Sequence, residues 1–198
     1  MAIRKIAQLG EPVLRQRAAE VPLTELGTPW FKQLVGDLIE TMRDADGAGL
    51  AAPQIFESIR VVAIEVRANP RYPAVETIEL MVLVNPRLTP LLRDPAAPAR
   101  DETMDVYEGC LSVAGLRGRV TRPRKILVEA MDPEGNELRS VWEGFRAVVV
   151  QHECDHLDGK LFVDRADTST LTFLREFERF VPASERVVDY GSGDEKNG

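Results

Sequence analysis

Sulfur and imidazole side chains are scarce in this sequence, which has 2 cysteines and 2 histidines among 198 residues. In a chain that is not secreted, two cysteines suggest free thiols or metal ligands before they suggest a disulfide. No apolar run reaches the ~20 residues that a membrane-spanning helix needs. The N-terminus also lacks the apolar core and cleavage site of a secretory signal. We therefore expect a soluble protein that is not exported and does not enter a membrane.

The sequence also has no excess of basic residues. Lys and Arg number 25 against 32 Asp and Glu, which gives a formal charge of −7. Nucleic-acid-binding surfaces are normally basic, so the composition argues against direct, sequence-specific binding of nucleic acid. The stretch from Arg117 to Lys125 is locally basic. We interpret it as a solvated loop with one or two structural ion pairs.

The length and composition fit one domain with a tail. An apolar share of 44% is enough to bury a core, and no internal repeat or second domain is evident. We assign residues 1–183 to a single domain. From Ser184 the sequence becomes polar and Gly-rich. We predict that residues 184–198 form a polar tail that is partly disordered, above all in its last eight residues.

Local patterns predict two helices in the first quarter of the chain. A short helix is expected with Pro12 in its first turn. A longer one begins after Thr28, which can cap it, with Pro29 in the first helical position. Apolar residues then recur at three- and four-residue spacing and are interpreted as core: Trp30, Phe31, Leu34, Val35, Leu38, Ile39 and Met42. Gly47 and Gly49 end this pattern.

Strands and loops are predicted over the middle of the chain. Arg60–Val66 and Ile78–Val84 are rich in branched apolar residues and favour strands. Ile126–Met131 and Glu137–Val141 flank an Asp-Pro-Glu-Gly-Asn turn and predict a hairpin. Two proline-containing segments are expected to be loops, Arg67–Val75 and Pro90–Thr103. A late amphipathic helix is marked by Leu171, Leu174, Phe177 and Phe180.

The segment from Gln151 to His156 contains a His-Glu-x-x-His motif. Helical residues turn by about 100° each, so His152 and His156 would share one face and reach one ion. Glu153 lies one step round the helix, beside that ion. A divalent ion lowers the pKa of a water molecule, and a neighbouring carboxylate can take the proton and return it to a leaving group. The motif therefore predicts a metal-dependent hydrolase with Glu153 as its general base.

Propensity alone would make Val148–Val150 a strand. In a strand, His152 and His156 would lie about 13 Å apart, too far to share an ion. We therefore predict a helix over Gly144–Leu157. The alternative is a chance match on a surface helix that binds nothing. The apolar residues before the motif, and the fact that it holds both histidines of the chain, favour a metal site.

A catalytic metal site needs a third protein ligand and an open fourth position. Cys154 lies two residues after His152, about 200° round the helix, and would point away from the ion. We interpret it as a small buried apolar residue. Cys110 follows Gly109, which allows a sharp turn or a close approach of the backbone. A thiolate at Cys110 can complete a Cys-His-His site.

Three segments together resemble the motifs of the peptide deformylase family, in matching order and spacing: Gly47–Gln54 (GAGLAAPQ), Glu108–Ser112 (EGCLS) and Gln151–His156 (QHECDH). The likeness runs from about Ile3 to Val181. It implies an α+β fold with mixed and antiparallel sheets packed around a central helix that bears the His-Glu-x-x-His motif. Residues 1–183 would then be the catalytic domain.

The implied reaction removes the N-formyl group from the N-terminal formylmethionine of newly synthesised polypeptides and releases formate. The implied partners are nascent formyl-Met chains at the ribosome, in the cytoplasm of a bacterium or in an organelle if the protein is eukaryotic and processed. The family's metal is usually ferrous iron, and zinc, nickel or cobalt can replace it. The Cys-His-His set suits zinc at least as well, so it does not identify the ion.

The resemblance also assigns catalytic roles by position. The implied metal ligands are Cys110, His152 and His156. Glu153 would be the acid and base. The side chain of Gln54 and the backbone N–H of Leu111 would stabilise the oxyanion that forms when the formyl carbonyl is attacked. A neutral amide can do so without competing for the metal.

Further positions would contact the substrate. The methionine pocket falls on Ala48, Val106, Phe145, Val148 and Val149. Phe145 and Val148 can share a helix face with His152, which supports that placement. Gly47 and Gly49 would let their segment pass close to the substrate backbone. Additional implied contacts are Glu108 and Gly109, and the family pattern would pair Arg122 with Asp155 behind the site.

Two departures and two alternatives accompany this interpretation. Ala114 stands where the family often has proline, and the Pro90–Thr103 loop is long for the family. A zinc peptidase that cleaves internal peptide bonds shares the motif, but it usually recruits a third His or Glu, and the chain has no third histidine. An inactive metal-binding relative would tolerate loss of Glu153 or Gln54, and both are present.

Overall fold

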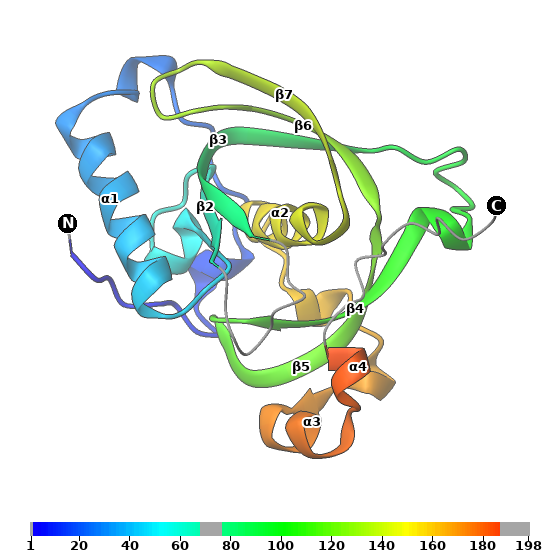
Figure 1. Cartoon of the computed structure of the whole chain (residues 1–198). Helices are drawn as coiled ribbons and strands as arrows, with labels where there is room; N and C mark the ends of the chain where they lie inside the picture. The colour runs from blue at the N-terminus through cyan, green and yellow to red at the C-terminus, as the bar shows by residue number, and fades with distance from the viewer. Residues whose placement is uncertain (1, 68–76, 187–198) are drawn as a thin grey trace.

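Two antiparallel sheets enclose a central helix in the computed structural model, which describes residues 2–67 and 77–186. Figure 1 shows α2 (Gly144–Leu157) in the middle, with strands of both sheets curving around it. The larger sheet has the order β1-β2-β3-β6-β7 and the smaller one the order β4-β5-β8. The α+β prediction is confirmed. Within the described residues every strand pair is antiparallel, and the parallel pairing is an isolated bridge between Ala19 and Ile59.

The larger sheet contains the strands that the sequence predicts. Its members are β1 (Gly49–Ala51), β2 (Val61–Val66), β3 (Ile78–Pro90), β6 (Lys125–Met131) and β7 (Glu137–Glu143). The β6–β7 hairpin is confirmed, and it pairs Ile126 with Trp142. β3 continues beyond the predicted end at Val84, past an irregularity before Arg87. No strand was predicted just after Gly47, but β1 pairs with β2 there.

The smaller sheet was not predicted. It consists of β4 (Thr103–Cys110), β5 (Val113–Pro123) and the short β8 (Thr172–Phe173). The expectation of a solvated loop from Arg117 to Lys125 is wrong, since most of this stretch is strand and Arg122 is buried. The expected ion pairs are present, since Arg122 pairs with Glu108 and Asp155. The Pro90–Thr103 loop is confirmed, with one short 3-10 turn, η4 (Arg100–Glu102).

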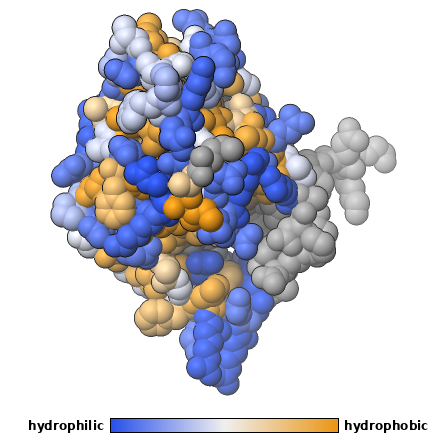
Figure 2. Space-filling view, turned by 90° about the vertical axis from the view of Figure 1, so that its left-hand side faces the viewer, coloured by the Kyte–Doolittle hydropathy of each residue, from blue (hydrophilic) through white to orange (hydrophobic). Residues whose placement is uncertain are grey.

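Helix α1 (Pro29–Asp44) forms as predicted. The Thr28 hydroxyl accepts a hydrogen bond from the backbone N–H of Phe31 at 3.2 Å, and Pro29 occupies the first helical position. Its buried apolar stripe packs on the larger sheet through Phe31, Leu34, Leu38 and Met42. Trp30 does not belong to the core and is 48% exposed, because it lies one step round from the centre of the stripe. Figure 2 views this side of the molecule and shows apolar surface interrupted by hydrophilic residues.

Helix α2 has the predicted bounds although it contains three consecutive valines. Eleven of its fourteen residues are buried. A helix that is enclosed on every side has no solvent-facing stripe, and α2 buries polar as well as apolar residues. Tertiary packing therefore overrides the strand propensity of Val148–Val150. The early 3-10 turn η1 (Pro12–Arg15) also matches its prediction.

The C-terminal part differs from its prediction at both ends. The late helix α3 (Leu174–Phe180) begins three residues after Leu171, because Phe173 pairs with Leu116 in the smaller sheet. Phe177 is buried, but Phe180 is 68% exposed. A short helix α4 (Ala183–Arg186) continues into the expected tail. The rest of that tail, including its last eight residues, and nearly all of the Arg67–Val75 loop lie outside the described residues. No helix in the described part is long and apolar enough to span a bilayer.

Candidate metal centre

The structure brings the three predicted metal ligands together. Cys110 is the last residue of β4, and His152 and His156 lie on α2. Their ligand atoms are all within 4.8 Å of one another, and the Cys110 Sγ is 3.2 Å from Nε2 of His156. Cys110 and His156 are buried, and the His152 side chain is 11% exposed. A thiolate with two imidazoles is a donor set that suits a divalent transition-metal ion.

Glu108 fixes the orientation of the first histidine. Burial on its own would raise the pKa of Glu108, but hydrogen bonds from Arg122 and His152 outweigh it and hold the pKa at about 2. An ionised carboxylate only accepts, so Nδ1 of His152 donates to Glu108 at 2.8 Å. This leaves Nε2 as the ring nitrogen that is available to bind an ion. Burial lowers the pKa of His156 well below its usual value, which favours the neutral, metal-binding imidazole.

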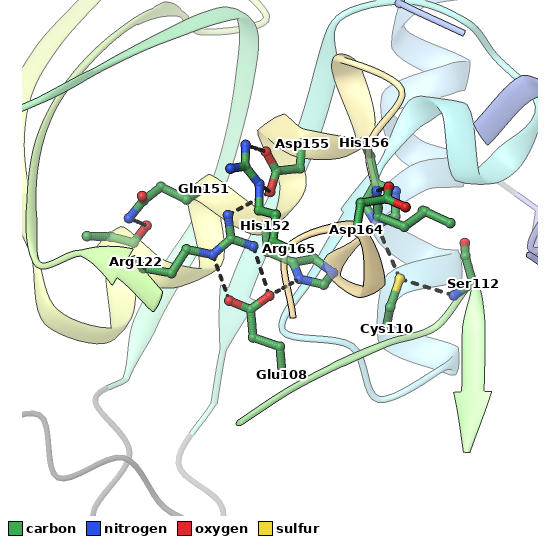
Figure 3. Close-up of polar contacts among 12 residues, drawn as sticks. Glu108, Cys110, Ser112, Arg122, Gln151, His152, Asp155, His156, Asp164 and Arg165 are labelled. Atoms are coloured by element: carbon green, nitrogen blue, oxygen red, sulfur yellow. Dashed lines mark hydrogen bonds and ion pairs between the residues drawn. The ribbon is translucent and has the colours of Figure 1, made fainter. Parts of the chain in front are cut away.

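A chain of ion pairs extends behind His152, as Figure 3 shows. Arg122 donates to both oxygens of Glu108 at 2.7 and 2.9 Å and to Asp155 at 2.6 Å. Arg165 donates twice to the same Asp155, at 2.7 and 2.6 Å. The implied pairing of Arg122 with Asp155 is therefore present. Arg165 was not predicted, because nothing in its local sequence distinguishes it from an exposed arginine.

Glu153 lies beside the ligands and is buried. Its Oε2 makes no hydrogen bond with any described residue. Burial raises the pKa of Glu153 to about 7. The backbone of β1 passes directly over it, because a Cβ added to Gly49 would lie 2.5 Å from the Glu153 Oε1. Glu153 therefore has the unpaired oxygen and the near-neutral pKa that suit a general base.

Gln54 is held with its donor group toward the ligands. It lies in the 3-10 turn η3 (Ala52–Ile55), and its Oε1 accepts from the backbone N–H of Ala51 at 2.8 Å. Because that N–H can only donate, Nε2 must face the other way. It lies 3.1 Å from the Ser112 hydroxyl and 3.6 Å from the Cys110 Sγ. Ser112 belongs to a recognised motif, but its contact with Gln54 was not predicted.

An adjacent cavity of about 170 Å³ collects most of the predicted site residues. Its lining contains Ala48, Gln54, Val106, Glu108, Gly109, Cys110, Leu111, Phe145, Val148, Val149, His152 and Glu153. Tyr107 also lines it and was missed, because β4 was not predicted. Gly47 packs against Leu111, where an added Cβ would lie 2.9 Å from Cδ1. The carboxylate of Glu108 is bonded to Arg122 and His152, so its part in substrate binding stays a prediction.

Cys154 lies away from the ligand cluster, as its place on the helix predicts. It is buried in the apolar core between α2 and the larger sheet. Burial raises the pKa of its thiol. Within the part of the chain that is described, Cys110, His152 and His156 form the one group of this kind that can hold a metal ion.

Comparisons with known proteins identify the family. The model of the polypeptide deformylase family matches residues 3–171. A peptide deformylase from Leptospira biflexa is 45% identical over 172 residues, which cover 86% of this chain and 92% of that protein. Peptide deformylase 2 from Pseudomonas putida is 41% identical and covers 82% and 87% of the two chains.

Comparison with solved structures identifies the same family. A class I type b peptide deformylase from Acinetobacter baumannii bound to Met-Ala-Ser matches with a TM-score of 0.75 and 37% identity, covering 83% of this chain and 98% of that one. A peptide deformylase from Legionella pneumophila matches with a TM-score of 0.71 and 34% identity, covering 90% and 96%. With its Cys-His-His cluster and buried glutamate, this chain belongs to the peptide deformylase family of metal-dependent hydrolases, which remove the formyl group from N-terminal methionine.

Proposed function

We propose that Cys110, His152 and His156 hold the divalent ion of this deformylase and that Glu153 moves the protons of the reaction. The convergence of three ligand atoms within 4.8 Å, next to a buried carboxylate oxygen without a partner, carries this proposal. A bound ion supplies a Lewis acid, which lowers the pKa of water and polarises a carbonyl group. The remaining chemistry falls to side chains and backbone groups of this chain.

Glu153 is the proposed acid and base. With a pKa of about 7, raised by burial, it can take a proton and release it again near neutral pH. The proton it takes from the attacking water would go to the amine that leaves with the polypeptide. The close contact with Gly49 restricts where the carboxylate can move.

Gln54 and Leu111 are the proposed oxyanion donors. The Gln54 amide is oriented before the reaction by Ala51, so no reorganisation is needed when negative charge develops on the formyl oxygen. Leu111 directly follows the ligand Cys110 and lines the same cavity. Its backbone N–H would approach the oxyanion from the β4 side.

The cavity beside the ligands is the proposed methionine pocket. Val106 from β4 and Val148 from α2 form one apolar cluster, and Ala48, Phe145 and Val149 complete the apolar lining. An unbranched, polarizable thioether fits such a pocket well. The Met-Ala-Ser complex of the Acinetobacter baumannii relative supports this choice of substrate.

We further propose ferrous iron as the physiological ion and nascent formyl-Met chains at the ribosome as the substrate, in a bacterial cytoplasm. The donor set fits iron, zinc, nickel or cobalt. The family relationship favours iron. The curated relatives from Leptospira and Pseudomonas, both bacteria, favour a bacterial setting.

Anaerobic purification with metal analysis, followed by a formate-release assay on formyl-Met-Ala-Ser, tests the proposal. Wild-type protein should hold one ion per chain and release formate. Glu153→Ala should keep the ion and lose about 10²–10⁴-fold in kcat, because proton transfer is removed while the ligands remain. Glu137→Ala, at an exposed strand position, is the matched control and should be fully active.

Near-normal turnover of a folded Glu153→Ala variant would remove the general-base role. Cleavage of internal peptide bonds without formate release would instead favour the zinc-peptidase alternative. If the anaerobically purified protein contains zinc and no iron, the choice of iron is wrong, but the assignment of the ligands stands.

A further inference from the structure

A second cavity lies behind the catalytic helix. It has a volume of about 380 Å³ and shares no lining residue with the methionine pocket. One wall is the rear of α2, at Gln151, Cys154 and Asp155, and other walls come from β3 and β5. Its volume is within the ~300–1,000 Å³ typical of small-molecule sites. No step of the deformylation uses it.

The lining of this rear cavity is basic in a chain whose net charge is −7. Five arginines face it: Arg17, Arg60, Arg87, Arg122 and Arg165. The acidic residues in the lining are Asp155 and Asp158. Arg60 pairs with Asp158 at 2.8 Å, and Arg122 is fully engaged with Glu108 and Asp155. These pairs neutralise part of the charge in the lining.

Three of the arginines retain donors for a ligand. Arg17 makes no hydrogen bond or ion pair with any residue that the structure describes. Arg87 is 75% exposed and pairs with Glu20, which is 62% exposed, so solvent competes with that contact. Arg165 uses Nε and Nη2 for Asp155, and the described residues leave its Nη1 without a partner. The three come from the N-terminal segment, from β3 and from the turn after α2.

We propose that the rear cavity binds a small phosphate-bearing anion through Arg17, Arg87 and Arg165. A guanidinium presents a planar fork of N–H donors that matches phosphate oxygens. Guanidinium groups on three separate segments suit a tetrahedral dianion, whose oxygens point in several directions. A planar monoanion such as a carboxylate offers fewer oxygens and one charge. Free phosphate and a mononucleotide share the chemistry that this site recognises.

Calorimetric titration of the metal-loaded enzyme tests the proposal, with inorganic phosphate and AMP as separate probes. Sodium chloride and acetate at matched ionic strength serve as reference anions. The wild type should bind phosphate saturably, and Arg17→Ala/Arg87→Ala should weaken it at least tenfold. The control Arg93→Ala/Arg139→Ala removes the same charge from two exposed arginines elsewhere and should bind as the wild type does. AMP that binds more tightly than phosphate would identify a nucleotide site.

Several results would overturn the rear site. Binding of phosphate that is unchanged in Arg17→Ala/Arg87→Ala would place the phosphate outside the rear cavity. Equal weakening in the control variant would show a general charge effect. If acetate or chloride competes as well as phosphate does, the cavity has no specificity for phosphate. If a single-stranded RNA binds but phosphate and AMP do not, the arginines belong to a surface for nucleic acid. Formate release by both double variants should stay at the wild-type level, which separates this test from that of the deformylase site.

Discussion

The two thiols of the chain have different surroundings and should respond differently to substitution. Cys110 ends β4 within reach of both histidines, whereas Cys154 is packed in the apolar core. Cys110→Ser replaces a soft thiolate with a poor neutral ligand and should sharply reduce the metal content per chain. Cys154→Ala should leave metal content and activity nearly intact. Elemental analysis of both purified variants measures the metal content. Loss of metal in Cys154→Ala but not in Cys110→Ser would refute the ligand assignment.

Gly49 is predicted to be essential for the position of Glu153. A methyl group at Gly49 would meet the carboxylate at 2.5 Å, so Gly49→Ala must displace either β1 or Glu153. A shift of about 1 Å in a catalytic group can cost ~10²-fold in rate. We expect a loss of that order in kcat with unchanged metal content. In Glu153→Ala, adding Gly49→Ala should cause no further loss, and an additional large loss would show that Gly49 acts independently of Glu153.

Residue spacing predicts the metal ligands, but not the partners that orient them. His152 and His156 follow from helical geometry, and Cys154 is excluded by the same geometry. The partner of His152 is Glu108, 44 residues away in sequence, and that of Gln54 is Ser112, 58 residues away. Such pairs arise when strands and helices pack. The sequence of either residue alone carries no signal for them.

At the scale of elements, β4 and α2 meet through Val106 and Val148 and would form two walls of the proposed methionine pocket. Formyl-norleucine peptides keep the shape of methionine and should react nearly as well. Formyl-alanine peptides lose three buried heavy atoms, worth about 2 kcal/mol or roughly thirtyfold in kcat/KM. Val148→Asp should reduce activity on formyl-Met and leave the ion bound. Measuring kcat/KM for the three formyl peptides tests this prediction. If the formyl-alanine peptide reacts as fast as the formyl-methionine peptide, the pocket assignment is wrong.

Helices and strands with a clear sequence pattern are predicted correctly here. The smaller sheet is the main element that was not predicted from the sequence. The β6–β7 hairpin has a strong turn signal between two apolar runs. β5 instead carries arginines, which are usually exposed, and glycines, which are uncommon in strands. Arg122 is buried only because Glu108 and Asp155 neutralise it. That compensation depends on two other segments. Composition therefore predicts a loop where the fold forms a strand.

At the scale of the whole molecule, a bound ion would join β4 of the smaller sheet to the central helix. A ligand at ~1,000 times its dissociation constant stabilises the folded state by about 4 kcal/mol. Each kcal/mol corresponds to about 2–4 °C for a chain of this size. Chelation should therefore lower the Tm by about 10 °C, in the wild type and equally in Glu153→Ala. Calorimetry before and after chelation measures this, and an unchanged Tm would show that the ion does not connect these elements.

The enclosure of α2 has a consequence for how the enzyme would move. A helix with eleven buried residues out of fourteen can exchange its amide hydrogens only when the surrounding strands open. Its amides should be among the slowest in the chain to take up deuterium. Both histidines and Glu153 would then keep fixed positions from one turnover to the next. Any adjustment to substrates of different length would fall to the less enclosed wall, where β4 and Tyr107 face the cavity.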